Sequence, residues 1–530
     1  MQQKISLVSN APLFECDDDD DDDQGTRVQK SARNRYLAAR HYAVTHFDPA
    51  QTDSFPYEVP RVTLQVDLKQ MARVIRGPVN IITLASTSPD YMWAASSEGF
   101  TYVDVSNDGF REVARIVAPG QKAIPNELQE NILDERFTTA EQVEHAVFDG
   151  YGLDWVRMGN GVYVVVDRDN HAFYNTADGS LSEFALVDED DPAAGIQLVK
   201  TVDMREAIGE GNLMTGTGMT YDGKLVVASN QTLSVFERNL EGEPQTFRFD
   251  DELVTNSFAI DEDNGIYIAS DKYMRKLVWT GSKLSDDEDD GAWKVRYDSG
   301  QQPPTVKIGT GTGSTPTLMG FDDDEDRLVV ITDGANHMKL VAFWRDEIPD
   351  DWTALQGASS ARIAGHIQVF AGLNERSDFI QSEQSVVVHG YGAFVVNNIA
   401  KKGEEDKLVD VLALGPVNEP GRGCERFEWD PCEHRWEPVW SRGDIVSISM
   451  VPSVSTASGI VFVNGYYADT GWEVTGLDWD TGETVQRISF GFDNRGNGAY
   501  AILQYAPNGD LIFNGVGGPA RVPLNRERDS

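Results

Sequence analysis

The chain has 530 residues, of which 86 are acidic and 45 are basic, so its formal charge at pH 7 is −41. A polyanion of this kind is repelled by nucleic-acid phosphates and by anionic lipid surfaces, so direct binding to nucleic acid or to a membrane is not expected. Apolar residues make up 40% of the chain, which is enough for a folded core and excludes global disorder. No window reaches the ~18 consecutive apolar residues of a membrane-spanning helix.

The acidic residues are spread along the whole chain rather than confined to one tail. Asp outnumbers Glu, and Arg outnumbers Lys, a balance that resembles proteins of salt-in halophiles. In concentrated salt the Debye length falls to a few Å, so the self-repulsion of such a chain is screened. We interpret the charge as adaptation to high salt, and the alternative is an ordinary acidic protein with an acidic tail.

The first 55 residues are expected to form a disordered tail outside the core. Seven consecutive aspartates at 17–23 precede a basic stretch at 27–40, and such charge blocks are usually solvated. A metal-binding role for the aspartate run is a second interpretation. Residues 1–14 contain no apolar run long enough for a secretory signal, so a cytoplasmic location is expected.

From about residue 78 onward, a short apolar strand, an acidic or glycine turn and a β-branched strand recur in the same order. The paired segments are 81–84 with 91–95, 153–156 with 162–166, 218–221 with 225–228, 257–260 with 266–269, 317–320 with 328–331, 385–388 with 393–396, 447–450 with 460–463, and 501–504 with 511–513.

Most of these pairs are followed by two further strands, as at 425–429 and 436–440. Four antiparallel strands per unit, repeated radially, predict an all-β fold: a β-propeller over residues 56–526 with eight blades, or seven if one repeat is an insertion. The last unit has only about three strands, so we expect the strand-like segment 62–66 to supply its outer strand and close the ring.

One helical insertion is predicted at about 124–148, between the first two blades. Thr138 and Glu141 have the spacing of a capping box. The apolar stripe of this helix consists of Ala140, Val143, Ala146 and Val147. Such an insertion either packs against the propeller or covers one of its faces.

The propeller topology predicts where a ligand would bind. In each blade the first strand starts, and the second strand ends, on the same face, so residues at these positions surround one mouth of the central channel. The polar residues at these positions are Asn80, Thr217, Thr255, Asn256, Ser314, Thr315, Glu383, Gln384, Asn230, Asp271, Lys272, Asp333, Asn397, Asn398, Asn464 and Asn514. Oxygen-rich rings suit a hard cation such as Ca²⁺. The alternative is that Asn and Asp end strands because they bond their own backbone.

Three of the residues on this face are candidates for catalysis. His337 follows Asp333 in one loop, and Glu383 precedes a first strand. A histidine oriented by a carboxylate can act as a general base, and the alternative is a solvated loop histidine. The glycine-rich segment 309–315 lacks the lysine and the following helix of a phosphate-binding loop, so we interpret it as a connecting loop.

The hairpin sequence at 476–483 contains Asp478 followed by Thr481-Gly482. It resembles the turn between the third and fourth strands of quinoprotein-like propellers, which often read Ala-x-Asp-x-x-Thr-Gly. Members with pyrroloquinoline quinone carry an adjacent cysteine pair, which this chain lacks, so that cofactor is not expected.

The strand-end Asn and Asp residues are also similar to those of gluconolactonase-like propellers. That resemblance implies a divalent ion in the channel, with Glu383, Asn256, Asn398 and Asp333 as the counterparts of its ligands.

Two functions follow from these patterns. The first is a metal-assisted hydrolase or lactonase acting on a small polar substrate, with Ca²⁺ polarising a carbonyl group and Asp333 or Glu383 as base. The second is a non-catalytic propeller that binds a small polar ligand or a protein partner. The fold alone does not choose between them.

Overall fold

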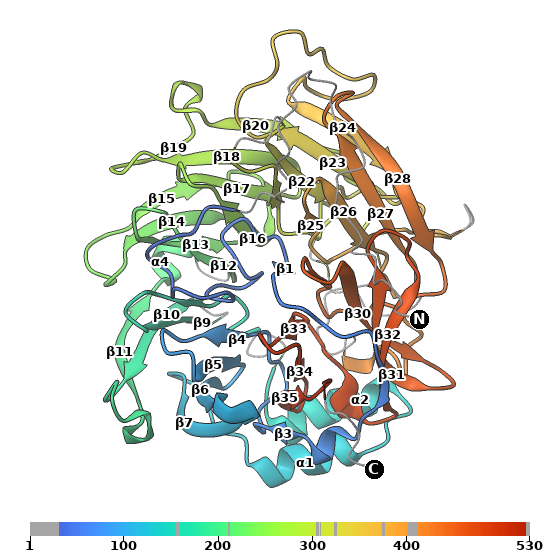
Figure 1. The fold of residues 1–530 in the computed structure, drawn as a ribbon. Helices are drawn as coiled ribbons and strands as arrows, with labels where there is room; N and C mark the ends of the chain where they lie inside the picture. Colours follow the sequence, from blue (N-terminus) through green and yellow to red (C-terminus); the bar gives the residue numbers. More distant parts are fainter. Residues whose placement is uncertain are drawn as a thin grey trace, which may run out of the picture.

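The computed structural model describes residues 31–154, 159–176, 179–209, 212–303, 307, 309–322, 326–373, 377–400 and 412–525. Figure 1 shows sheets arranged around a common centre, with the colours following one another around the ring. Within the described residues there are eight sheets, and the chain builds each from the innermost strand outwards. This arrangement confirms the predicted β-propeller fold.

The first four sheets follow the chain in order. Their strands are β4 (Thr83–Ala85), β5 (Tyr91–Ser96), β6 (Gly99–Asp104) and β7 (Arg111–Val117); β8 (Val165–Val166), β9 (Ala172–Thr176), β10 (Ser180–Leu186) and β11 (Ile196–Asp203); β12 (Met214–Met219), β13 (Lys224–Ser229), β14 (Thr232–Glu237) and β15 (Gln245–Arg248); and β16 (Val254–Ile260), β17 (Gly265–Ser270) and β18 (Tyr273–Trp279), with β19 (Leu284–Ser285) and β20 (Trp293–Arg296) both paired to β18.

The other four sheets complete the ring. Their strands are β21 (Thr317–Met319), β22 (Leu328–Thr332), β23 (Lys339–Trp344) and β24 (Ile363–Gln368); β25 (Val387–His389), β26 (Gly392–Val396), β27 (Cys424–Asp430) and β28 (Arg435–Arg442); β29 (Ser453–Ser455), β30 (Ile460–Tyr467), β31 (Gly471–Asp478) and β32 (Thr484–Gly491), joined by β1 (Ser54–Phe55) and β2 (Thr63–Gln65); and β33 (Gln504–Tyr505), β34 (Leu511–Gly515) and β35 (Gly518–Val522), joined by β3 (Ala72–Arg73).

Burial falls from the centre of each sheet to its rim. Every residue of the second strand β22 is buried, whereas the outermost strand β11 has only exposed or half-buried residues. Inner strands lie between two neighbouring sheets, so both of their faces are covered and their sequences are almost continuously apolar. The repeat is visible in the sequence for this reason.

Two of the predicted strand pairs are shifted. In the second sheet, Val165–Val166 forms the innermost strand β8, and the second strand is β9; the sequence had placed 162–166 as the second strand. In the seventh sheet the innermost strand is β29 (Ser453–Ser455) rather than 447–450. In both cases the inner strand is only two or three residues long, too short for periodicity to locate.

The segment 31–55, predicted to lie in a disordered tail, is part of the core, so that prediction is wrong for these residues; residues 1–30 lie outside the described part of the chain. Tyr42, Phe47 and Phe55 are each at most 2% exposed and belong to the largest apolar cluster. Figure 1 shows this segment, in blue, crossing the centre of the ring. The charge-based prediction failed because the aromatic residues between the charges are the ones that pack.

We call residues 34–55 the N-terminal strap. It makes hydrogen bonds to the innermost strand, or to the turn directly after it, in all eight sheets. The bonded pairs are Tyr42 with Ala85, Ala38 with Val166, Asn34 with Met219, Pro49 with Ile260, Ala50 with Leu318, Thr52 with Val388, Asp53 with Val454, and Tyr42 with Tyr505. The strap therefore lies at the end of the ring where first strands turn into second strands, opposite the predicted ligand face.

Ring closure uses a different strand from the one predicted. The segment 62–66 does form a strand, β2, but it pairs in parallel with β32 on the outer side of the seventh sheet. The fourth strand of the eighth sheet is β3, which pairs antiparallel with β35. The two segments are a few residues apart, and β3 is too short and too polar to be recognised in the sequence.

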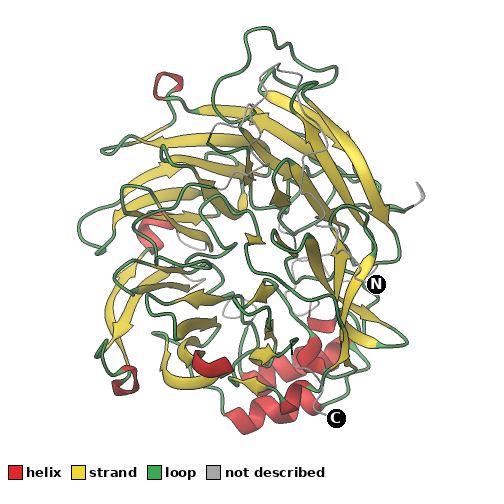
Figure 2. Cartoon of the chain, viewed as in Figure 1, coloured by secondary structure: helices red, strands yellow, loops and turns green. Residues whose placement is uncertain are grey.

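The predicted helical insertion is present as α1 (Asn126–Asp134), α2 (Ala140–His145) and a π-helical turn (Ala146–Tyr151). Its capping box lies one residue later than predicted, between Thr139 and Gln142. Figure 2 shows these helices gathered beside the sheet of β33–β35. Arg73 of β3 forms two hydrogen bonds with Glu130 of α1, at 2.6 and 2.7 Å.

A further short helix, α4 (Arg205–Ile208), follows β11. In the described part of the chain, none of the helices has the length and apolar character needed to cross a membrane.

Candidate functional site

The sequence-predicted residues lie at the end of the ring away from the strap. Asn256 is in β16, Asp333 follows β22, Glu383 precedes β25 and Asn398 follows β26. Asn398 and Glu383 are in contact: the Asn398 amide donates to Glu383 Oε1 at 3.4 Å, and the Glu383 backbone N–H donates to Asn398 Oδ1 at 3.1 Å.

The glycine-rich loop 309–315 links Asn256 to Glu383. The Asn256 amide donates to the carbonyl of Gly313, and a Cβ on Gly313 would lie 2.6 Å from the Cα of Glu383. A Cβ on Gly311 would lie 2.5 Å from the Cα of Asp271. Only glycine permits such close approach of one backbone to another, so the glycines let this loop pass between neighbouring sheets.

Asn256 is fully engaged by its surroundings. Its Oδ1 accepts hydrogen bonds from the Tyr163 hydroxyl, from Thr315 Oγ1 at 2.9 Å and from the Ser257 backbone N–H at 2.9 Å. Tyr163 lies just before β8 of the second sheet and Asn256 lies in β16 of the fourth, so this contact joins two sheets that are not neighbours in the ring.

A tyrosine completes the site. The buried hydroxyl of Tyr500 has no hydrogen-bond partner among the described residues. Burial raises the pKa of Tyr500 well above its usual value, and the nearby Glu383 and Tyr163 raise it further. Tyr500 therefore presents a neutral donor next to a carboxylate.

Lys307 lies under the glycine-rich loop and is 4% exposed. Its ammonium group donates to the Gly311 carbonyl at 2.7 Å and to Gln381 Oε1 at 2.7 Å. Burial lowers the pKa of Lys307 to about 8, although Glu383 and Asp333 act in the opposite direction. We call Tyr163, Asn256, Lys307, Glu383, Asn398 and Tyr500 the axial site.

Asp333 and His337 have other contacts. Asp333 Oδ1 accepts hydrogen bonds from the backbone N–H groups of Ala335 and Lys339, at 3.1 and 2.9 Å, and so stabilises its own loop. His337 Nε2 is 2.6 Å from the carbonyl oxygen of Ser377. This contact directs the ring toward the backbone of a neighbouring loop, and the predicted pairing of His337 with a carboxylate is not among its described contacts.

The other strand-end asparagines also bind backbone groups. Asn230 accepts from the Leu213 N–H at 2.9 Å and donates to the Val254 carbonyl at 2.8 Å, and Asn464 accepts from the Gly498 N–H at 3.1 Å. Their recurrence is thus explained by the need to satisfy backbone groups where strands end.

The four candidate metal ligands do not fit a Ca²⁺ site as they stand. Ca²⁺ takes 6–8 oxygen ligands, but the side-chain oxygens of Asn256 and Asn398 already accept internal hydrogen bonds. The ammonium group of Lys307 also interacts electrostatically with the carboxylates of Glu383 and Asp333. Within the described residues, no group of three or more His, Cys, Asp or Glu residues is placed to hold a metal ion.

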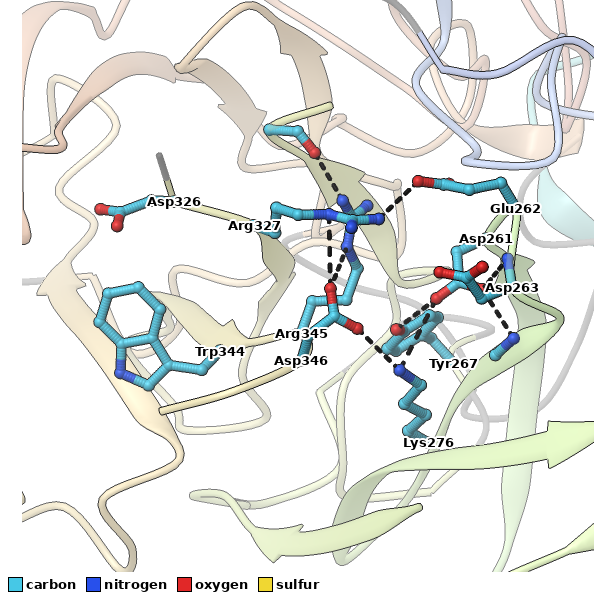
Figure 3. Close-up of polar contacts among 12 residues, drawn as sticks. Asp261, Glu262, Asp263, Tyr267, Lys276, Asp326, Arg327, Trp344, Arg345 and Asp346 are labelled. Atoms are coloured by element: carbon cyan, nitrogen blue, oxygen red, sulfur yellow. Dashed lines mark hydrogen bonds and ion pairs between the residues drawn. The ribbon is translucent and has the colours of Figure 1, made fainter. Parts of the chain in front are cut away.

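A second polar cluster joins the fourth and fifth sheets (Figure 3). Asp346 contacts Lys276 at 2.8 Å and Arg327 at 3.4 Å, and Arg327 also pairs with Glu262. Arg345, which is fully buried, donates to the Gly320 carbonyl at 2.7 Å. These contacts cross between sheets and balance charge, so we assign the cluster to the packing of the two blades.

Sequence reasoning missed Tyr163, Lys307 and Tyr500. Lys307 stands two residues before the glycine-rich loop, and that proximity was the one available signal. Tyr500 lies in a loop with a left-handed backbone, at φ 58°, and nothing in the sequence distinguishes it from other tyrosines.

No protein-family model matches the chain. An uncharacterized protein of Archaeoglobus fulgidus is 33% identical over 329 residues, which cover 59% of this chain and 61% of that protein. The match therefore spans about three fifths of the relative's length.

Among solved structures, the quinohemoprotein alcohol dehydrogenase ADHIIG of Pseudomonas putida HK5 aligns with 89% of this chain and 75% of its own, with a TM-score of 0.50 and 11% identity. A 6-phosphogluconolactonase-like protein of Bacteroides fragilis aligns with 76% of this chain and 92% of its own, with a TM-score of 0.40 and 11% identity. The first likeness agrees with the β-propeller fold and with the predicted quinoprotein-like resemblance, at the level of fold alone.

Proposed function

We propose that the axial site binds a small polar ligand rich in hydroxyl and carbonyl groups. The observation that carries this proposal is the buried Tyr500 hydroxyl, which lies near the half-buried Glu383 and has no hydrogen-bond partner among the described residues. A buried polar group without a partner is costly, and a ligand hydroxyl or carbonyl would satisfy it. The closely packed strap covers the opposite end of the ring, so the ligand would enter from the axial face.

The chemistry we propose for this site is hydrolysis of a lactone or similar ester. Glu383 would take a proton from a water molecule while the oxygen of that water attacks the carbonyl carbon. Glu383 would then give the proton to the ring oxygen as the ester bond breaks. Tyr500 would donate a hydrogen bond to the carbonyl oxygen as it gains charge. Lys307 would hold the glycine-rich loop in place through its bond to Gly311.

The test is hydrolysis of D-glucono-δ-lactone followed by pH-stat, with binding of D-gluconate followed by calorimetry. Glu383→Gln keeps the acceptor for Asn398 but removes the base, so turnover should fall by about 10²-fold or more. Tyr500→Phe removes a hydroxyl that has no described protein partner, so it should weaken catalysis and binding while leaving the melting temperature near that of the wild type. Asp350→Asn, at an exposed position, is the matched control.

Three outcomes separate the alternatives. Activity that survives both active-site variants would contradict the proposal. Binding without turnover would favour a non-catalytic ligand-binding propeller. Activity abolished by a chelator and restored by Ca²⁺ would favour the metal-assisted form, which requires Asn256 or Asn398 to exchange an internal hydrogen bond for the ion.

A further inference from the structure

A cavity of about 280 Å³ lies at the opposite end of the ring, between the N-terminal strap and the inner strands. The strap and the residues that flank it contribute to its wall, from within 31–43 and 47–56. Phe321, Val388, His389, Gly390 and Thr456, from the fifth, sixth and seventh sheets, complete it. The cavity is therefore separate from the axial site and is formed only when the strap is in place.

The wall of this cavity is largely apolar and aromatic. Among its lining residues are Phe47, Phe55, His41 and His389. Phe321 also lines it, and the guanidinium group of Arg345 lies 5.6 Å from the centroid of the Phe321 ring. The His41 ring lies against Tyr42 and Phe47, with centroids 4.7 and 5.8 Å apart. Aromatic rings carry negative charge on their faces, so a cage of this kind attracts organic cations.

One carboxylate lines the same cavity. Asp48 accepts hydrogen bonds from Thr52, through Oγ1 at 2.5 Å and through the backbone N–H at 3.4 Å. Among the described residues, no Lys, Arg or His forms an ion pair with it, and the charged neighbour that acts on it most strongly is another acid, Asp53. Burial raises the pKa of Asp48 to about 6, as expected for a carboxylate that lacks a cation.

The two arginines of the cavity do not serve as that cation. Arg40 lines the cavity but donates to the carbonyl of Ser88 at 3.2 Å. Arg33 also lines it and is exposed, and neither arginine is among the groups that shift the pKa of Asp48. Within the described part of the chain, the carboxylate therefore has no charge partner.

We propose that this cavity binds a small organic ammonium ion with an apolar body, its charge placed against Asp48 and its body against Phe47 and Phe55. The volume suits a ligand of about the size of one substituted ring. The site is independent of the axial site, so either proposal can fail without the other.

The test uses the full chain and three probes of matched size: benzylammonium, benzyl alcohol and benzoate, titrated by calorimetry near neutral pH at fixed ionic strength. Benzylammonium should bind at least about tenfold more tightly than benzyl alcohol, a difference within the range of one desolvated cation–π contact and one ion pair. Benzoate should not bind, because the carboxylate repels it. Equal affinity for the amine and the alcohol, or tighter binding of benzoate, would overturn the proposal.

The variant Asp48→Asn tests whether Asp48 causes the preference for the charged probe. The variant keeps an oxygen for the Thr52 hydrogen bonds, and its preference for the amine over the alcohol should disappear. Asp350→Asn makes the same charge change at an exposed position and should retain the preference. If Asp48→Asn does not fold, the comparison of the three probes on the wild-type protein still decides the question.

Discussion

At the scale of single residues, the hairpin between β31 and β32 shows a local pattern that needs no tertiary context. Asp478 Oδ1 accepts hydrogen bonds from the Thr481 N–H at 3.1 Å and from Thr481 Oγ1 at 3.0 Å, and Gly482 has a φ of 71°. An Asp side chain bonds the backbone two or three residues on, and glycine accepts the left-handed conformation at no steric cost. The predicted turn is found where the sequence placed it for these reasons.

Asp48 is a residue whose environment the sequence could not predict, and it leads to a pH-dependent effect on stability. Its pKa is raised by burial to about 6 in the folded protein, so the folded state binds more protons than the unfolded state between about pH 4 and 6. The free energy of unfolding therefore falls as pH rises through that window. The contribution of Asp48 is at most about 3 kcal/mol, from a shift of roughly two units at 1.36 kcal/mol each.

The measurement is the free energy of unfolding of wild type and Asp48→Asn by denaturant titration across this pH range. The variant cannot titrate at this position. The free energy of unfolding of the variant minus that of the wild type should therefore increase as pH rises from about 4 to 6. Other acids, such as Glu428, whose pKa burial raises to about 7, act in the same direction in both proteins and cancel in the difference. A difference that stays constant with pH would contradict the assignment.

At the scale of elements, the strap is the largest departure from what the sequence indicated. Charge runs around it suggested a tail, but its aromatic residues reach the centre of the ring. A sequence-based prediction of a loop or tail rests on the average polarity of the segment. Burial depends instead on which individual side chains face the core. A segment without strand or helix periodicity has no sequence pattern that indicates its burial.

The strap leads to a second prediction, for Phe47→Ala. Phe47 is 2% exposed and packs against Tyr42 and Phe55, with ring centroids 4.5 and 6.3 Å apart. Removing a buried phenylalanine costs about 3–5 kcal/mol of unfolding free energy, so the variant should melt well below the wild type in calorimetry. Arg35→Ala, at an exposed position of the same strap, should change stability by no more than about 0.5 kcal/mol. Equal stability of the two variants would show that the strap is not part of the core.

The short inner strands explain why some elements were shifted in the prediction. β8 has two residues and β29 has three, and strands of that length have no alternation to detect. Such strands are fixed by pairing with longer neighbours, β9 and β30, and by hydrogen bonds to the strap, which are tertiary features.

At the scale of the whole molecule, the charge of −41 remains the dominant property of the surface. We propose that it is an adaptation to salt, and this gives a third prediction. Screening shortens the Debye length from about 10 Å at 0.1 M to about 3 Å at 1 M, which weakens the self-repulsion that destabilises the folded state. The melting temperature should therefore rise as KCl is increased over this range.

The control for the salt series is an equal osmolality of sucrose, which acts by exclusion from the surface and not by screening. KCl should raise the melting temperature more than sucrose does. A melting temperature that stays constant or falls as KCl is added would contradict the adaptation to salt and favour an ordinary acidic protein.

The sequence alone determined the repeat, and through it the propeller fold, because the inner strands must be apolar on both faces and the hairpins need Asp, Asn and Gly. It also predicted the helical insertion, and it placed Asn256, Asp333, Glu383 and Asn398 on one face of the ring. Only the tertiary structure decided which oxygens are already bonded, which strand closes the ring, and that residues 31–55 lie inside it. Those features depend on contacts between residues far apart in the chain, such as Tyr42 with Tyr505 and Tyr163 with Asn256, and no local pattern encodes such pairs.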